Sequence, residues 1–192
     1  MATKPQKIKA TRDDVAKLRE ALAFLAKREV LVGFPESTAE RTLEPDEKGD
    51  ITNAALGYIH DNGDPDANIP ARPFMREGMA EAIPGVTAGL MKVARQVVTR
   101  RSSVDVEKGL TQIGLKVQFA LRRKINEGIP PPLSPLTLAK RAAKGRKGAA
   151  KELENRAKGL PPSTQLAKPL IDTGQLRNAI NFVIRPRKAR KK

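Results

Sequence analysis

The feature that most limits the fold of this chain is a long run of apolar residues spaced three or four positions apart. In residues 104–127 this spacing places them on one face of a helix: Val106, Leu110, Ile113, Val117, Leu121 and Ile125. Gly128 follows as a stop signal. Residues 11–28 show the same spacing, and so do residues 84–97, with Pro84 suited to the first turn. The pattern predicts three amphipathic helices.

Shorter elements complete the prediction. Helices are expected over residues 51–60, from about 73 to 82, over 134–144, and after Gly174. Short apolar runs predict strands at residues 29–34 and 181–184. The fold class is therefore α+β, with a small antiparallel or mixed β-sheet flanked by several helices. Because two strands alone make a marginal sheet, either further strands are hidden or a neighbouring subunit completes it.

Composition predicts one domain with flexible appendages. A single domain over residues 11–184 follows a flexible N-terminus at residues 1–10. It contains an acidic loop at residues 36–50 and a mobile basic insertion with weak helical character at residues 145–168. No apolar run is long enough for a transmembrane helix, and no secretory signal peptide is recognisable.

The positive charge is concentrated in the last third of the chain. Residues 1–133 hold 21 Lys and Arg against 18 Asp and Glu, whereas residues 134–192 hold 16 against 3. This block suggests a polyanionic partner, either nucleic acid or an acidic protein surface; the alternative is a solvated, partly disordered arm. With only five Phe, one Tyr and no Trp, phosphate or protein contact is favoured over base stacking. The candidate contact residues form the basic tail at residues 185–192: Arg185, Arg187, Lys188, Arg190, Lys191 and Lys192.

The sequence offers little that supports catalysis. It has no cysteine and one histidine, His60, which we expect to be satisfied by the adjoining turn. No phosphate-binding glycine loop is present, and the acidic residues of the turn at 61–66 do not match a calcium loop. We therefore predict a protein that is not an enzyme and has no cofactor and no metal site; a nuclease that uses His60 is a distant alternative.

Three ordered segments resemble the tail-completion and neck proteins (virion morphogenesis, minor tail) of long-tailed bacteriophages. The first is Val-Leu-Val-Gly-Phe-Pro at residues 30–35. The second is a helix that ends in Ile-His-Asp-Asn-Gly at residues 59–63, followed by Ile-Pro-Ala-Arg-Pro-Phe at residues 69–74. The third is Pro-Leu-Ser-Pro from residue 132, followed by Pro-Leu-Ile-Asp-Thr-Gly-Gln-Leu from residue 169. The chain departs from the family at Asp61-Asn62, where an acid–aromatic pair is usual, and in its long basic stretch at residues 140–158.

The resemblance implies a structural virion protein that completes the neck or upper tail and helps to join tail to head. Its implied partners are the head–tail connector or stopper protein and the tail terminator or tail tube protein. It would form a ring, with six-fold symmetry suspected, around a channel in which the basic tail contacts DNA or an acidic neighbour. Assembly would take place in the host cytoplasm, without a membrane. The alternative is a non-specific cytoplasmic nucleic-acid-binding protein.

Two of these segments have a physical role that the sequence suggests. Ile69, Pro70, Arg72, Pro73 and Phe74 form an extended strap that the prolines stiffen. We expect Phe74 to anchor it in the core and Arg72 to pair with a carboxylate or a helix C-terminus, or else to lie on the surface.

The other segment is Asp172-Thr173-Gly174, in which Asp172 or Thr173 is expected to cap the last helix. The resulting tight turn would direct residues 181–184 back to residues 30–34, so that the first and last strands pair antiparallel.

Overall fold

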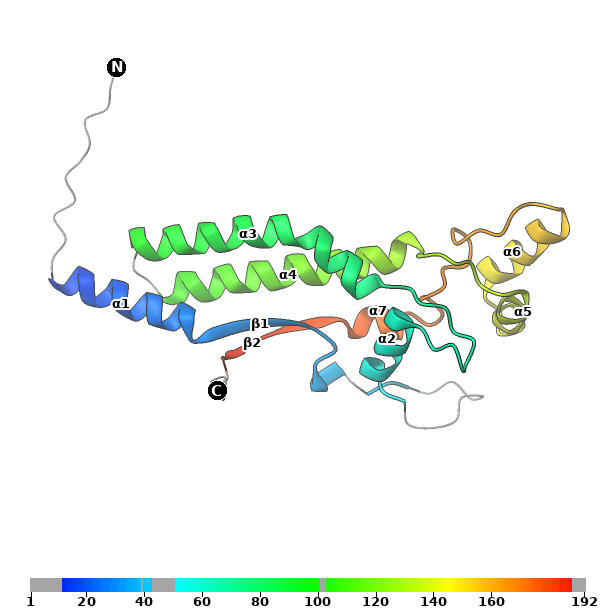
Figure 1. Ribbon diagram of the computed structural model, residues 1–192, viewed down its shortest axis with the longest axis horizontal. Helices are drawn as coiled ribbons and strands as arrows, with labels where there is room; N and C mark the ends of the chain where they lie inside the picture. The colour runs from blue at the N-terminus through cyan, green and yellow to red at the C-terminus, as the bar shows by residue number, and fades with distance from the viewer. Residues whose placement is uncertain (1–11, 39, 43–50, 101–102, 188–192) are drawn as a thin grey trace, which may run out of the picture.

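The computed structural model describes residues 12–38, 40–42, 51–100 and 103–187, which include seven α-helices and one two-stranded antiparallel sheet (Figure 1). The predicted α+β class is confirmed. In chain order the elements are α1 (Arg12–Ala26), β1 (Arg28–Gly33), a 3-10 turn (Glu36–Thr38), α2 (Asn53–Asn62), α3 (Phe74–Arg100), α4 (Ser103–Glu127), α5 (Pro135–Ala143), α6 (Lys147–Ala157), α7 (Gln175–Ala179) and β2 (Asn181–Pro186). Within these ranges no helix combines the length and the apolar character needed to span a membrane.

Some predicted segments lie outside the described residues. They are the flexible N-terminus at residues 1–10, most of the acidic loop at residues 36–50, and four of the six candidate contact residues in the basic tail: Lys188, Arg190, Lys191 and Lys192.

The long helices α3 and α4 lie side by side and form the body of the molecule (Figure 1). The six apolar residues predicted to share one face of α4 are all buried, as are Val93 and Val97 of α3. Glycine allows the two helices to approach closely. A Cβ atom added at Gly109 would lie 2.2 Å from Cγ2 of Val93, and one at Gly89 would lie 2.8 Å from Cγ1 of Ile113.

The predicted break before Pro84 is wrong. Two helices were expected in this region, but α3 runs without interruption from Phe74 to Arg100 with Pro84 inside it. A proline within a helix removes one backbone hydrogen bond and favours a bend, and Figure 1 shows that α3 is not straight. Packing against α4 supports the helix on both sides of Pro84, because Phe74 and Val93 both belong to buried clusters that contain α4 residues.

The first and last strands pair antiparallel, which confirms the predicted pairing. Val30 lies opposite Ile184 and Val32 lies opposite Phe182. These four residues occupy the alternate positions of one face of the sheet, and Val30, Val32 and Ile184 pack on the clusters built by α3 and α4. Phe182 fits over α4 at Gly114, where an added Cβ atom would lie 2.3 Å from the ring. The sheet thus rests on α4.

The weak helical character predicted for residues 145–168 is also wrong, because this segment contains α6. Its helix packs against α5, and the two share a small buried cluster of Leu133, Leu138, Ala149 and Ala167. Glu152 of α6 is 1% exposed and accepts hydrogen bonds from Nε of Arg156 at 3.0 Å and from the backbone N–H of Ser163 at 2.7 Å. The α5–α6 pair lies at one end of the α3–α4 body (Figure 1).

Candidate functional site

The strap (residues 69–74) is held at both ends by backbone and carboxylate contacts. At its start, Asp64 and Ile69 exchange two backbone hydrogen bonds of 2.8 Å, which close the preceding turn. Beyond its end, Oδ1 of Asp61 accepts the backbone N–H of Met75 at 2.7 Å, so that Asp61 caps the first turn of α3. Sequence reasoning missed this cap because the donor and the acceptor are fourteen residues apart.

Arg72 is buried, and both pairings expected for it are wrong, because its side-chain acceptors at Pro70 and Pro131 belong neither to a carboxylate nor to the end of a helix. Its side chain is neither a surface charge nor paired with a carboxylate in the contacts the structure describes: it is 4% exposed and donates to the carbonyl oxygen of Pro131 at 2.9 Å and to that of Pro70 at 3.4 Å. Its backbone N–H donates to the carbonyl of His60 at 2.7 Å. Burial lowers the pKa of the Arg72 guanidinium, and the nearby charge of Arg141 lowers it further. Arg72 therefore links the strap to the proline segment that precedes α5.

Phe74 occupies the centre of the core, as the sequence suggested. It is fully buried and packs in a cluster with Leu121, Ile125 and Ile180. Its ring meets that of Phe34 edge to face, with the ring centroids 6.4 Å apart. The aromatic contact joins the strap to the residue that follows β1.

The Asp172-Thr173-Gly174 segment makes the expected turn but not the expected cap. Gly174 adopts a left-handed conformation with φ of 84° at the N-cap of α7, and no side chain caps the helix there. Thr173 Oγ1 accepts the N–H of Gln175 at 3.3 Å, whereas Asp172 pairs with Nε of Arg146 at 2.9 Å. Asp172 fails as a cap because two arginines of the α5–α6 region, Arg141 and Arg146, lie within 4.0 Å of its carboxylate.

The chain between α7 and β2 is fixed by α4 side chains that sequence reasoning did not single out. Gln118 donates to the carbonyl of Ile180 at 3.0 Å, and Arg122 donates to the same oxygen at 2.7 Å and to the carbonyl of Asn178 at 2.9 Å. Gln118 is buried and Arg122 is half-buried. Gln118 lies three positions before Leu121 and Arg122 three positions before Ile125, and this spacing was the available signal.

Residues of α2 and of the segment from residue 169 meet at a cavity of about 170 Å³. Its lining includes Arg41, His60, Arg141 and the turn at residues 172–175. Burial lowers the pKa of His60 to about 4, and the positive charges of Arg72, Arg141 and Arg41 add to the effect. His60 is therefore neutral at pH 7, and its Nδ1 atom is buried without a hydrogen-bond partner in the described structure.

Acid is expected to destabilise the fold through His60. Its folded pKa of about 4 lies below the unfolded value of 6.5, so the unfolded state binds the proton first as the pH falls. Above pH 6.5 His60 is mostly neutral in both states, and its titration hardly changes the free energy of unfolding. Below pH 6.5 the free energy of unfolding falls, by on the order of 2 kcal/mol at pH 5. Urea unfolding at pH 7 and pH 5 measures this loss.

The matched control is His60→Gln, which cannot titrate in this range. Its stability should fall less between pH 7 and pH 5 than that of the wild type, by the amount due to His60. Equal losses in the two proteins would show that other groups carry the acid sensitivity.

The basic residues predicted to contact DNA or protein are only partly described. Arg185 lies in β2 and pairs with Glu29 of β1 at 2.8 Å, so its charge is compensated within the sheet. The backbone N–H of Arg187 donates to the carbonyl of Lys27 at 2.7 Å, which extends the strand pairing by one residue.

Comparison of the chain with protein-family models, with curated proteins and with solved structures finds no match.

Proposed function

We propose that this chain is a non-enzymatic structural protein of a bacteriophage particle, which completes the neck or upper tail and helps to join the tail to the head. The observation that carries the proposal is that the three segments resembling tail-completion proteins, although far apart in the sequence, pack on one another around a single core.

The contacts between the segments are specific. Phe34, from the first segment, lies against both Phe74 and α2 of the second; a Cβ atom added at Gly57 of α2 would lie 2.3 Å from its ring. Thr38, just beyond the first segment, donates through Oγ1 to the carbonyl of Ala179, just beyond the third, at 2.7 Å. Arg72 of the second segment reaches Pro131, next to the third. Each motif therefore supports another.

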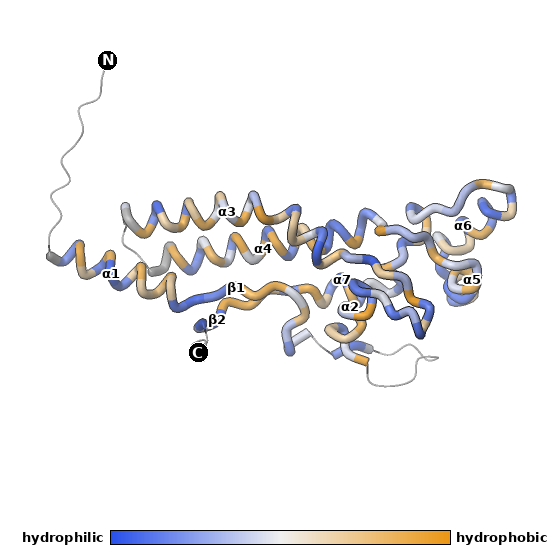
Figure 2. Tube along the Cα trace, viewed as in Figure 1, coloured by the Kyte–Doolittle hydropathy of each residue, from blue (hydrophilic) through white to orange (hydrophobic). Residues whose placement is uncertain are grey.

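The exposed surface also favours a protein that works within an assembly. Large apolar side chains lie exposed in rows on α3 and α4, rather than singly; Figure 2 shows apolar positions along both helices. On α3 the row includes Met79, Ile83 and Leu90, which are spaced four and seven residues apart, and on α4 it includes Leu115 and Phe119. Exposed apolar rows on helices are typical of protein–protein contacts.

In this proposal the helical body contacts neighbouring subunits of a ring and the adjoining neck or tail proteins. The expected neighbours are a connector or stopper on one side and a terminator or tail tube protein on the other. The basic end of the chain then faces DNA in the channel or an acidic neighbour, by contacts that salt weakens.

The test is electron microscopy of lysates from a phage in which this gene is disrupted. Filled heads beside separate tails are expected, and expression of the wild-type chain from a plasmid should restore joined, infectious particles. Normal infectious particles without the gene would overturn the proposal. In that case the alternative, a cytoplasmic protein that binds nucleic acid without sequence preference, becomes the first candidate.

A further inference from the structure

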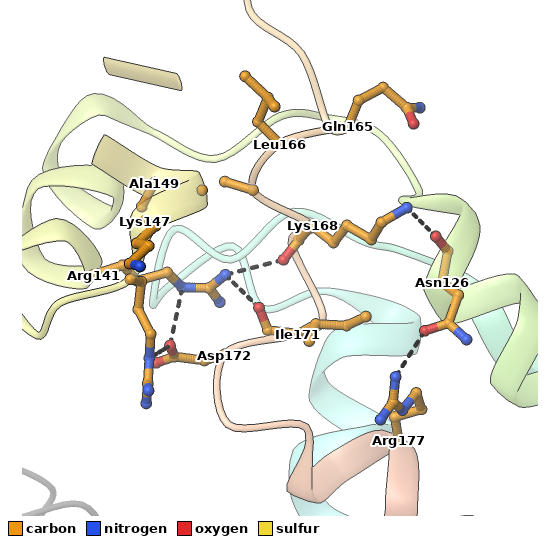
Figure 3. Close-up of a pocket in the computed structure, with 13 residues that line it drawn as sticks. Asn126, Arg141, Lys147, Ala149, Gln165, Leu166, Lys168, Ile171, Asp172 and Arg177 are labelled. Carbon is orange, nitrogen blue, oxygen red and sulfur yellow. Dashed lines mark hydrogen bonds and ion pairs between the residues drawn. The ribbon is translucent and has the colours of Figure 1, made fainter. Parts of the chain in front are cut away.

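A second and larger pocket lies where the end of α4 meets the start of α6. It has a volume of about 590 Å³. The chain at residues 165–172 passes through this region, between α6 on one side and Asn126 of α4 on the other (Figure 3). The pocket is called the basic pocket here because of the charged residues that line it: Arg141, Arg146, Lys147, Lys168, Arg177 and a single acid, Asp172.

The charges in the basic pocket are far from balanced. Asp172 is its only carboxylate, and it is already engaged with Arg146 at 2.9 Å. Nε of Arg141 lies 4.0 Å from the same carboxylate. The hydrogen bonds of Arg141, Lys168 and Arg177 are to neutral oxygens. Arg141 donates to the carbonyls of residues 168, 169 and 171, and Arg177 donates to Oδ1 of Asn126 at 3.1 Å (Figure 3). Neutral partners orient a guanidinium but leave its charge uncompensated, so five cations face one anion in this pocket.

The wall formed by α6 adds to the positive potential. Its first residues, Lys147, Gly148 and Ala149, line the pocket, and the N-cap residue Arg146 provides no side-chain hydrogen bond to this turn. The start of a helix carries a partial positive charge. The wall is also fixed in place, since an added Cβ atom at Gly148 would lie 2.1 Å from the carbonyl oxygen of Leu166. The pocket is thus formed before any ligand arrives.

We propose that the basic pocket binds a phosphate group. One carboxylate could neutralise only one of the excess charges, whereas a phosphate brings up to two negative charges and several acceptor oxygens, which suit a mixture of Arg and Lys. The volume exceeds that of a single phosphate and leaves room for the rest of a phosphate-bearing molecule. The phosphate comes either from a small molecule or from a nucleic acid backbone. This inference does not depend on the proposed function.

Lys147→Glu is the decisive variant. Lys147 is exposed, and an acid in the first turn of a helix is favourable, so this substitution should leave the fold intact. Lys151→Glu is the matched control, because it makes the same change of charge at an exposed position of α6 that does not line the pocket. Thermal unfolding of both variants verifies that they are folded.

Binding of pyrophosphate to the full chain at physiological salt is measured by calorimetry. The wild type and Lys151→Glu should bind with similar affinity, and Lys147→Glu should bind about tenfold more weakly or worse, as expected for the loss of a charge-assisted contact. Lys151 does not line the pocket and its charge acts on a ligand there only through solvent, so its replacement should have much the smaller effect. Absence of pyrophosphate binding to the wild type, or an equal loss in the two variants, would overturn the proposal.

Competition identifies the source of the phosphate. If a short DNA duplex displaces pyrophosphate and its own binding is weakened by Lys147→Glu, the natural ligand is a nucleic acid backbone. If the duplex does not compete, the ligand is a small phosphate-bearing molecule. Direct binding of polyglutamate that Lys147→Glu weakens, together with failure of pyrophosphate to bind, would assign the pocket to an acidic protein segment and overturn the phosphate assignment.

Discussion

Replacement of Phe74 by alanine is expected to lower the free energy of unfolding by about 3–5 kcal/mol. The side chain is 0% exposed and packs against residues of α4 and the chain before β2, and it also meets the ring of Phe34. The variant loses the transfer free energy of the ring and leaves a cavity that several fixed elements surround. Urea unfolding of the purified chain at pH 7.5, where His60 is neutral in both states, measures the change.

Phe119→Ala is the matched control for this experiment. Phe119 lies on α4 but is 68% exposed, so its removal should change the urea midpoint little. A Phe74→Ala variant as stable as Phe119→Ala would mean that the strap does not depend on the core for its anchorage. Because Phe119 belongs to the exposed row on α4, its variant is also useful for assembly experiments with a folded chain.

Replacement of Glu152 by alanine is expected to have an effect of similar size, about 3–5 kcal/mol, since it removes one partner of a buried ion pair. Glu152 is 1% exposed and accepts from both Arg156 and the backbone of Ser163. Its loss leaves the guanidinium of Arg156, which is 14% exposed, without its carboxylate, and leaves the Ser163 N–H without its acceptor. Hydrogen exchange of residues 147–167 should report the loss directly, together with the urea midpoint.

Glu154→Ala on the same helix serves as the control. Glu154 is exposed, and its pairing with Lys158 takes place in water, so its removal should leave both the midpoint and the exchange pattern nearly unchanged. Equal effects of the two substitutions would mean that the buried carboxylate does not hold α6 to the segment that follows it.

Much of the candidate site follows from local sequence patterns. The proline spacing of residues 69–74 predicted an extended segment, and Phe74 was the residue within it suited to the core. Gly174 predicted the turn that returns the chain to β1. These are short-range statements, because proline fixes φ and glycine permits positive φ regardless of what lies around them.

The partners of the charged residues did not follow from sequence. Arg72 finds the carbonyl of Pro131, 59 positions away, and Asp172 finds Arg146, 26 positions away. A carboxylate beside Thr-Gly is ordinarily read as a helix cap, and here two nearby arginines attract it instead. The basic pocket was missed for the same reason, although the excess of Lys and Arg after residue 134 indicated a partner of negative charge.

The sequence by itself determined the α+β class, the buried face of α4 and the pairing of the first and last strands, because apolar spacing specifies which face of a helix or strand is buried. Only the tertiary structure decided that α3 continues through Pro84 and that α6 packs as a helix. In α3, contacts with α4 on both sides outweigh the lost hydrogen bond. In α6 most residues are good helix formers. However, the buried face of this helix includes the carboxylate of Glu152. The free-energy cost of burying that charge is offset by hydrogen bonds from Arg156 and Ser163, which form in the folded chain.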